Sequence, residues 1–152
     1  MIIREAEWDD PAGVTLRTAQ RAELTIRYDD PDSEPGPAPT ADDMTRFLIA
    51  FDDDAVTPIA CGGLRGIDEQ HGEIKRMFVV ADRRGAGVAT AVLHELERIA
   101  RDELGWSRLV LETGNRQPDA IRLYEREGYV RVPNFGYYAA SDYSLCYELV
   151  LR

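Results

Sequence analysis

Short apolar runs and alternating apolar positions predict seven strands, and longer stretches with helical spacing predict three helices. The predicted strands cover residues 2–6, 46–52, 58–65, 73–80, 109–111, 129–132 and 145–151. The predicted helices cover residues 11–27, 88–104 and 118–127. This order contains no internal repeat. It indicates an α/β protein of the α+β type, with helices on the faces of a mixed, largely antiparallel sheet of six to seven strands.

The middle strands carry the clearest strand pattern. Residues 46–52 and 58–65 flank a polar turn, which predicts an antiparallel hairpin. The next strand, 73–80, has apolar residues on both faces: Ile74, Phe78 and Val80 on one, Met77 and Val79 on the other. A strand that is apolar on both faces belongs inside a sheet.

The helix at 88–104 has the strongest periodicity in the chain. Its apolar residues recur at every fourth position, as Val88, Val92, Leu96, Ala100 and Leu104. Gly105 follows as a stop signal. The shorter helix at 118–127 begins with Pro118 and is followed by Gly128, the usual residues for a helix start and a helix end.

Residues 29–43 combine acidic side chains with four prolines, Pro31, Pro35, Pro37 and Pro39. This composition disfavours helix and sheet, so the segment is predicted to be a long loop. A loop of this length in a small domain is either a functional lid or a mobile connection, and both interpretations stay open.

Length and composition limit the class of protein. A chain of 152 residues fits one domain spanning 1–152, and 44% hydrophobic with 30% charged residues is typical of a globular protein. The formal net charge of −10 disfavours nucleic acid as a partner and favours a cationic one. The apolar runs are much shorter than the ~20 residues that span a bilayer.

The N-terminal sequence and the positions of the cysteines and histidines predict a cytoplasmic protein without a metal site. The first ten residues lack the apolar stretch of a signal peptide. Cys61 and Cys146 lie in strand-like segments and are expected to be buried and reduced. The two histidines, His71 and His94, lie far apart and have no cysteine pair nearby, so no zinc site is predicted.

The segment between strand 73–80 and helix 88–104 has the composition of a phosphate-binding loop. A helix N-terminus offers unpaired N–H groups, and the glycines in Arg83-Arg84-Gly85-Ala86-Gly87-Val88-Ala89 let an anion approach the backbone. The two arginines add positive charge. A tight strand-to-helix turn with two solvated arginines is the structural alternative. The loop lacks the Gly-Lys-Ser/Thr of a Walker A motif, and Thr90 stands where a dinucleotide fingerprint needs Gly or Ala.

Arg84, Gly87 and Ala89 match the pattern Arg/Gln-x-x-Gly-x-Gly/Ala, and here the chain resembles the GCN5-related N-acetyltransferase (GNAT) superfamily. A second motif of that family, Leu-Tyr-Glu-x-x-Gly-Tyr, stands at residues 123–129, and the resemblance covers roughly residues 46–151. It implies a GNAT-like acyl-CoA-binding fold with acetyl-CoA as acyl donor and no metal. The residues that it implies for pyrophosphate binding are Arg84, Gly85, Ala86, Gly87, Val88, Ala89 and Thr90.

The resemblance also implies roles in the chemistry. It implies that Tyr124 is the acid that protonates the leaving thiolate. The structural alternative is that Tyr124, at a sheet-facing position of its helix, is an ordinary core aromatic. Glu112 and Glu73 compete as the base; the structural alternatives are a capping or salt-bridging Glu112 and a strand-edge Glu73 that faces solvent. The carbonyl oxygen and the pantetheine arm are expected at the backbone of Phe78, Val79 and Val80. Asn115 is a further pantetheine contact or a turn former.

The expected reaction is direct acetyl transfer to a primary amine of a small molecule or peptide, and a non-catalytic CoA-binding module is the alternative. The aromatic residues of the last loop, with the loop at 29–43, are candidates for the acceptor pocket or for a cover of the core. The negative charge of 29–43 favours a cationic amine, or serves solubility only. A homodimer is left open.

Overall fold

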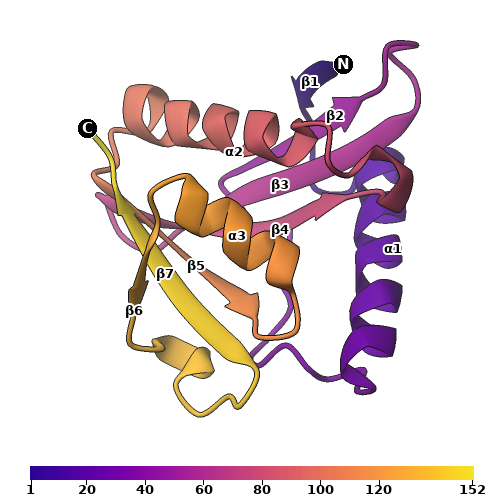
Figure 1. Ribbon diagram of the computed structural model, residues 1–152. Coiled ribbons are helices and arrows are strands. Elements are labelled where there is room, and N and C mark those ends of the chain that lie inside the picture. The colour runs from indigo at the N-terminus through magenta and orange to yellow at the C-terminus, as the bar shows by residue number, and fades with distance from the viewer.

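The computed structural model describes residues 1–152 as seven strands and three α-helices in the predicted order (Figure 1). The strands are β1 (Ile2–Glu5), β2 (Arg46–Phe51), β3 (Pro58–Gly66), β4 (His71–Val79), β5 (Arg108–Gly114), β6 (Val130–Val132) and β7 (Ser144–Val150). The helices are α1 (Pro11–Tyr28), α2 (Val88–Arg98) and α3 (Pro118–Arg126). Residues 29–43 form no helix or strand, as predicted.

All seven strands form one sheet in the order β1-β2-β3-β4-β5-β7-β6. Only β4 and β5 pair in parallel, so the prediction of a mixed, largely antiparallel sheet is confirmed, including the β2–β3 hairpin. β5 is longer than predicted, because β7 pairs with it along its whole length, up to Gly114. Glu112 therefore lies within a strand opposite Cys146 instead of at a strand end.

Two apolar clusters cover opposite faces of the sheet. α1 packs on one face, where its Leu16 joins Phe47 and Ile49 of β2. α2 and α3 pack on the other face, and Val92 and Leu96 of α2 belong to the larger cluster there. Figure 1 shows α1 on one side of the sheet and α2 and α3 on the other. No helix is long and apolar enough to span a membrane.

The predicted helix at 88–104 differs from the structure at its C-terminal end. The α-helix ends at Arg98, and residues Ile99–Glu103 form a wider π-helical turn in which the Leu104 N–H donates to the Ile99 carbonyl. The wider turn keeps both Ile99 and Ala100 buried beneath the end of the helix.

The strict alternation predicted for 73–80 is wrong at one position. Arg76 has a φ of 61°, and the register with β3 shifts beside it, which is a β-bulge. The extra residue moves Ile74 to the same face as Met77 and Val79, while Phe78 joins the cluster on the α1 face. The bulge lies in the middle of the sheet, close to Ile74, where the pairing of β4 with β5 ends.

Both cysteines are free and buried, as predicted. Burial raises the pKa of the Cys61 thiol to about 12, which makes a thiolate at neutral pH unfavourable. No group of three or more His, Cys, Asp or Glu side chains is placed to hold a metal ion.

Candidate active site

The N-terminus of α2 lacks a capping side chain. Its N-cap is Gly87, in the left-handed region at φ 81°, and no side chain accepts from the first turn. The first N–H groups of a helix have no partner within the helix, so those that follow Gly87 are available to a ligand. Gly85 also has a φ of 81°, and at both glycines a Cβ atom would meet no protein atom within 4 Å. The loop therefore has the open backbone that a diphosphate requires.

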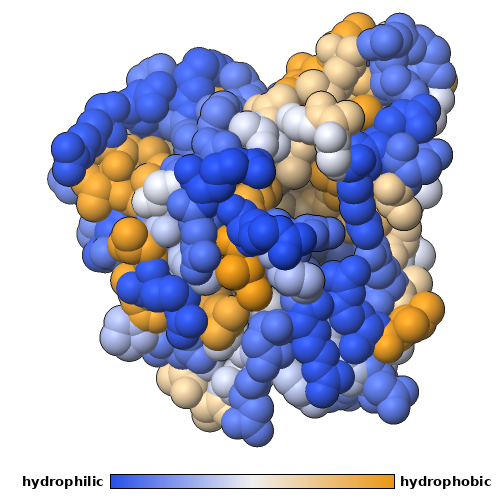
Figure 2. Space-filling view, viewed as in Figure 1, coloured by the Kyte–Doolittle hydropathy of each residue, from blue (hydrophilic) through white to orange (hydrophobic).

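The loop borders a cavity of about 520 Å³. Its walls come from α1, the end of β4, the start of α2, and α3, and Figure 2 shows the hollow between these helices with hydrophobic surface at its floor. Six of the residues predicted to bind cofactor through this loop line it: Arg84, Gly85, Gly87, Val88, Ala89 and Thr90. Ala86 lies outside the lining. The cavity and its uncapped helix fit an elongated ligand with a diphosphate group.

The two arginines of the loop are not free, contrary to the sequence interpretation that they add positive charge to it. Arg84 donates from Nη1 and Nη2 to Glu23 of α1 at 2.8 and 2.7 Å, and from Nε to the Val79 carbonyl at 2.9 Å. Arg83 donates from Nε to Asp52 at 3.2 Å. These carboxylates come from distant segments, so the loop sequence gave no sign of them. The loop's attraction for anions therefore rests mainly on its backbone N–H groups.

β4 has an open edge toward the cavity. Its pairing with β5 ends at Ile74 opposite Leu111, so the stretch from Lys75 to Val79 has no strand partner on that side. Phe78 and Val79 line the cavity, whereas Val80 lies outside it and its N–H donates to the Ile59 carbonyl. Gln20 of α1 donates to the Met77 carbonyl at 2.9 Å. An unpaired strand edge can hydrogen-bond an extended ligand as an added strand does.

Tyr124 reaches the same cavity from α3. Its side chain is 5% exposed and lines the cavity, and its ring lies edge-on to Tyr129 at 5.6 Å between centroids. Burial raises the pKa of Tyr124, and the charge of Glu112 raises it further. The phenol is therefore held protonated. No group of the protein hydrogen-bonds its hydroxyl, so that proton is available to a ligand.

Glu112 lies on β5 and is not part of the cavity lining. Its Oε2 accepts from the Ser144 hydroxyl at 2.6 Å, and its other oxygen has no partner in the protein. Burial raises the pKa of Glu112, and the hydrogen bond from Ser144 opposes this shift. A buried carboxylate with one free oxygen and a raised pKa is a stronger base than an ordinary glutamate and is suited to accept a proton.

Glu73, the other candidate base, is buried, and both of its oxygens are engaged. Oε1 accepts from Arg65 at 2.9 Å and Oε2 from the Tyr138 hydroxyl at 2.7 Å. Lys75 donates to the same hydroxyl at 2.8 Å and to Glu34 at 3.0 Å. Glu73 therefore belongs to an ion network across the sheet face, and the solvent-facing alternative considered for it is wrong.

Sequence reasoning missed this network. Lys75 and Arg76 are basic residues inside an otherwise apolar strand, and a buried charge needs a partner, so their presence was the available signal. The partner is Glu34, which pairs with both from the loop at 29–43. Although burial opposes ionisation, the charges of Lys75 and Arg76 hold the pKa of Glu34 below its usual range. One residue of that loop thus contacts the centre of the sheet.

Asn115 lies away from the cavity. Its side-chain amide donates to the Asp142 carbonyl at 3.1 Å, and its backbone N–H donates to the Tyr143 carbonyl at 2.7 Å. Both bonds join the end of β5 to the segment before β7. A role for Asn115 in pantetheine binding stays a prediction, as do the roles given above to the other site residues.

Comparison with known proteins agrees with this geometry. The family model described as acetyltransferase (GNAT) family matches residues 4–129. The chain is 38% identical over 105 residues to an IAA acetyltransferase from Azospirillum brasilense, which covers 68% of this chain and 66% of the relative. The match thus spans a little under two thirds of that curated relative's length.

Solved structures share the whole fold. A Klebsiella pneumoniae protein assigned as an acyl-CoA N-acyltransferase has a TM-score of 0.82 and 27% identity, covering 99% of this chain and 97% of that one. A GNAT family acetyltransferase from Elizabethkingia anophelis, solved with acetyl-CoA bound, has a TM-score of 0.71 and 17% identity, with coverage of 99% and 97%. The match of the family model over most of the chain, together with the open glycine loop at the start of α2, shows that this chain belongs to the GNAT family of acetyltransferases.

Proposed function

We propose that this protein transfers the acetyl group of acetyl-CoA directly to a primary amine of a small molecule or peptide. The observation that carries the proposal is the cavity into which both the uncapped N-terminus of α2 and the unpaired hydroxyl of Tyr124 open. Diphosphate recognition and a proton donor thus share one ligand space. Acetyl-CoA supplies the activated thioester, and the protein supplies orientation and two proton transfers.

The backbone around Gly85 and Gly87 and the N–H groups of Val88 to Thr90 would hold the diphosphate. The open edge of β4 at Phe78 and Val79 would bind the arm that carries the acetyl group and polarise its carbonyl. Arg84, held by Glu23, keeps its place at the border of the cavity, and its charge is largely balanced by that carboxylate.

The acceptor amine must lose a proton, because an alkylammonium with a pKa near ~10.4 is not a nucleophile. Glu112 takes this proton, directly or through water. The amine nitrogen then forms a bond to the carbonyl carbon while the carbon–sulfur bond breaks. Tyr124 donates its proton to the leaving thiolate. The nitrogen of the new amide releases its second proton to solvent, and Tyr124 regains a proton from solvent.

The test is release of free thiol from acetyl-CoA in the presence of a panel of amines, with the acetylated product identified by its mass. The panel holds amino acids, polyamines, aminoglycosides and peptides with free N-termini. Amine-dependent thiol release together with an N-acetylated product supports the proposal. Binding of acetyl-CoA without release for any amine would instead identify a CoA-binding module. Absence of binding would reject both functions.

A further inference from the structure

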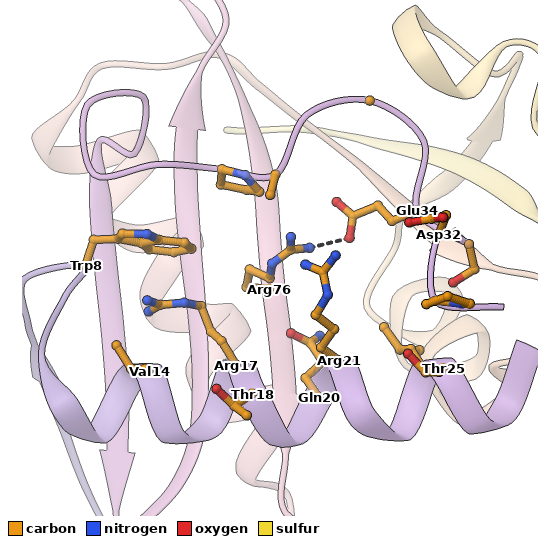
Figure 3. A pocket seen from close by; sticks show the side chains of 16 residues that line it. Trp8, Val14, Arg17, Thr18, Gln20, Arg21, Thr25, Asp32, Glu34 and Arg76 are labelled. Carbon is orange, nitrogen blue, oxygen red and sulfur yellow. Dashed lines mark hydrogen bonds and ion pairs between the residues drawn. The ribbon is translucent and has the colours of Figure 1, made fainter.

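A second cavity, of about 370 Å³, lies between α1 and the loop residues 31–39 (Figure 3). Gln20 and Leu24 of α1 line both this cavity and the one described above, so the two adjoin along α1. Arg76, the residue of the bulge in β4, also lines the second cavity. A molecule in the second cavity would therefore lie next to acetyl-CoA in the proposed site, as the acceptor of the acetyl group must.

Two arginines of α1 line the second cavity without a carboxylate partner. Arg17 lies flat over the Trp8 ring, with its guanidinium carbon 3.6 Å from the ring centroid, and its Nη1 is buried without a hydrogen bond. Arg21 stands one helical turn further along and extends toward Arg76 in Figure 3. Burial lowers the pKa of Arg17 from its usual value.

The proximity of Arg17 and Arg21, neither of which has a carboxylate partner, costs stability. Like charges four residues apart destabilise a helix, and a buried guanidinium nitrogen without an acceptor loses its hydration. The chain has 28 acidic residues, and most of its other arginines form salt bridges with them. Arg17 and Arg21 thus stand out as cationic side chains left unpaired beside a cavity.

The acidic groups nearby do not neutralise these two arginines. Glu34 lines the cavity, but its carboxylate binds Lys75 and Arg76. Asp32 also lines the cavity and forms no salt bridge, and Asp9 acts on Arg17 only through its long-range charge. The cavity keeps room for one more anion next to Arg17 and Arg21.

We propose that the acceptor is an amine that also carries a carboxylate, and that Arg17 and Arg21 bind this carboxylate so that the amine points to the neighbouring cavity. The guanidinium fork matches the two oxygens of a carboxylate. This inference rests on the proposed function and names its substrate class. It replaces the expectation of a purely cationic acceptor, because the charge that lines the cavity decides recognition more directly than the net charge of −10.

The test compares α-, β- and γ-amino acids with their carboxamides as acceptors. Each amide keeps the amine and loses the negative charge, and its amine deprotonates more readily, so the comparison is biased against the proposal. We expect a higher kcat/KM for the acids. Arg17→Gln and Arg21→Gln should each lower kcat/KM for the acids by about 10- to 100-fold and leave the amides unchanged.

Arg4→Gln is the matched control, because Arg4 is exposed on β1, forms no salt bridge and lies outside both cavities. Arg17→Gln removes the contact with Trp8 and could destabilise the protein. Arg21 is exposed, so Arg21→Gln should fold and still tests the site. Equal use of acids and amides, or an equal loss for both in the arginine variants, would overturn the inference.

The outcomes also separate this inference from the proposed function. Thiol release with amines that lack a carboxylate, and none with amino acids, leaves the function standing and rejects the carboxylate site. If acetyl-CoA binds but no acceptor turns over, calorimetric titration of the amino acids into the CoA complex decides. Binding that weakens in Arg21→Gln and is unchanged in Arg4→Gln supports the site, and absence of binding rejects it.

Discussion

Replacement of Tyr124 by phenylalanine removes one oxygen atom from the proposed site and leaves the packing of α3 intact. The Tyr124 ring stays buried against Tyr129, and the hydroxyl that is lost makes no hydrogen bond within the protein. The free energy of unfolding should therefore change little. The loss should fall on catalysis, because the free hydroxyl of Tyr124 in the cavity is the proposed proton donor to the leaving thiolate.

The magnitude follows from the usual contribution of a positioned acid. Such an acid contributes about 10²- to 10⁴-fold, which corresponds to about 2.7–5.5 kcal/mol in activation free energy. We expect kcat to fall within this range, with unchanged affinity for acetyl-CoA. The assay is thiol release at saturating acetyl-CoA and amine, with single-turnover experiments to ensure that chemistry limits the rate.

Tyr129→Phe is the matched control. Tyr129 packs against Tyr124 but donates its hydroxyl proton to Glu97 at 2.8 Å and lies outside the cavity lining. Its variant should lose about 1.5–3 kcal/mol of stability, the usual range for a hydrogen bond to a charged group, and keep its kcat. If Tyr124→Phe keeps kcat within twofold of the wild type, Tyr124 is a core aromatic and the proton comes from elsewhere.

Three further predictions test the rest of the site. Gly87→Glu places a carboxylate at the N-cap of α2 and should abolish calorimetric binding of CoA; Gly105→Glu, at another open glycine with φ 70°, is its strain control and should bind CoA normally. Because the pKa of Glu112 is raised and a base works only when deprotonated, kcat/KM should fall as pH drops through a pKa above the ordinary ~4.3. Glu112→Gln should remove that limb of the pH profile and Glu73→Gln should retain it; the reverse result would move the base to Glu73. Glu23→Gln removes a carboxylate from the cavity wall and should tighten CoA binding a few-fold, measured by titration at low salt, and weaker binding would mean that Glu23 serves by positioning the loop.

The sequence was sufficient to predict the element order because each element has its own periodicity and its own stop signals. Helix α2 is an example, since its buried residues Val88, Val92 and Leu96 have the predicted four-residue spacing. The bulge at Arg76 was not predictable, because it depends on which residue of β3 stands opposite. A non-glycine residue at positive φ leaves no mark on hydrophobic spacing.

The site was predictable only where one continuous segment builds it. The glycine loop before α2 is local, so its open backbone followed from residues 83–89. The partners of Arg84 and Lys75 come from segments 41 or more residues away, and composition cannot indicate such pairs. The second cavity was missed for the same reason, since it needs α1 and the loop at 31–39 to face each other.

The binding of acetyl-CoA compared with S-acetylpantetheine tests the central claim most directly, because the second molecule carries the acetyl group but lacks the diphosphate and nucleotide. Both are titrated into the wild-type protein by calorimetry at the same salt concentration. If the N-terminus of α2 and its glycine loop hold the diphosphate, acetyl-CoA should bind with a stoichiometry of one and about 100-fold more tightly. Equal affinity for the two molecules, or no binding of acetyl-CoA to the folded protein, would contradict the assignment of this cavity.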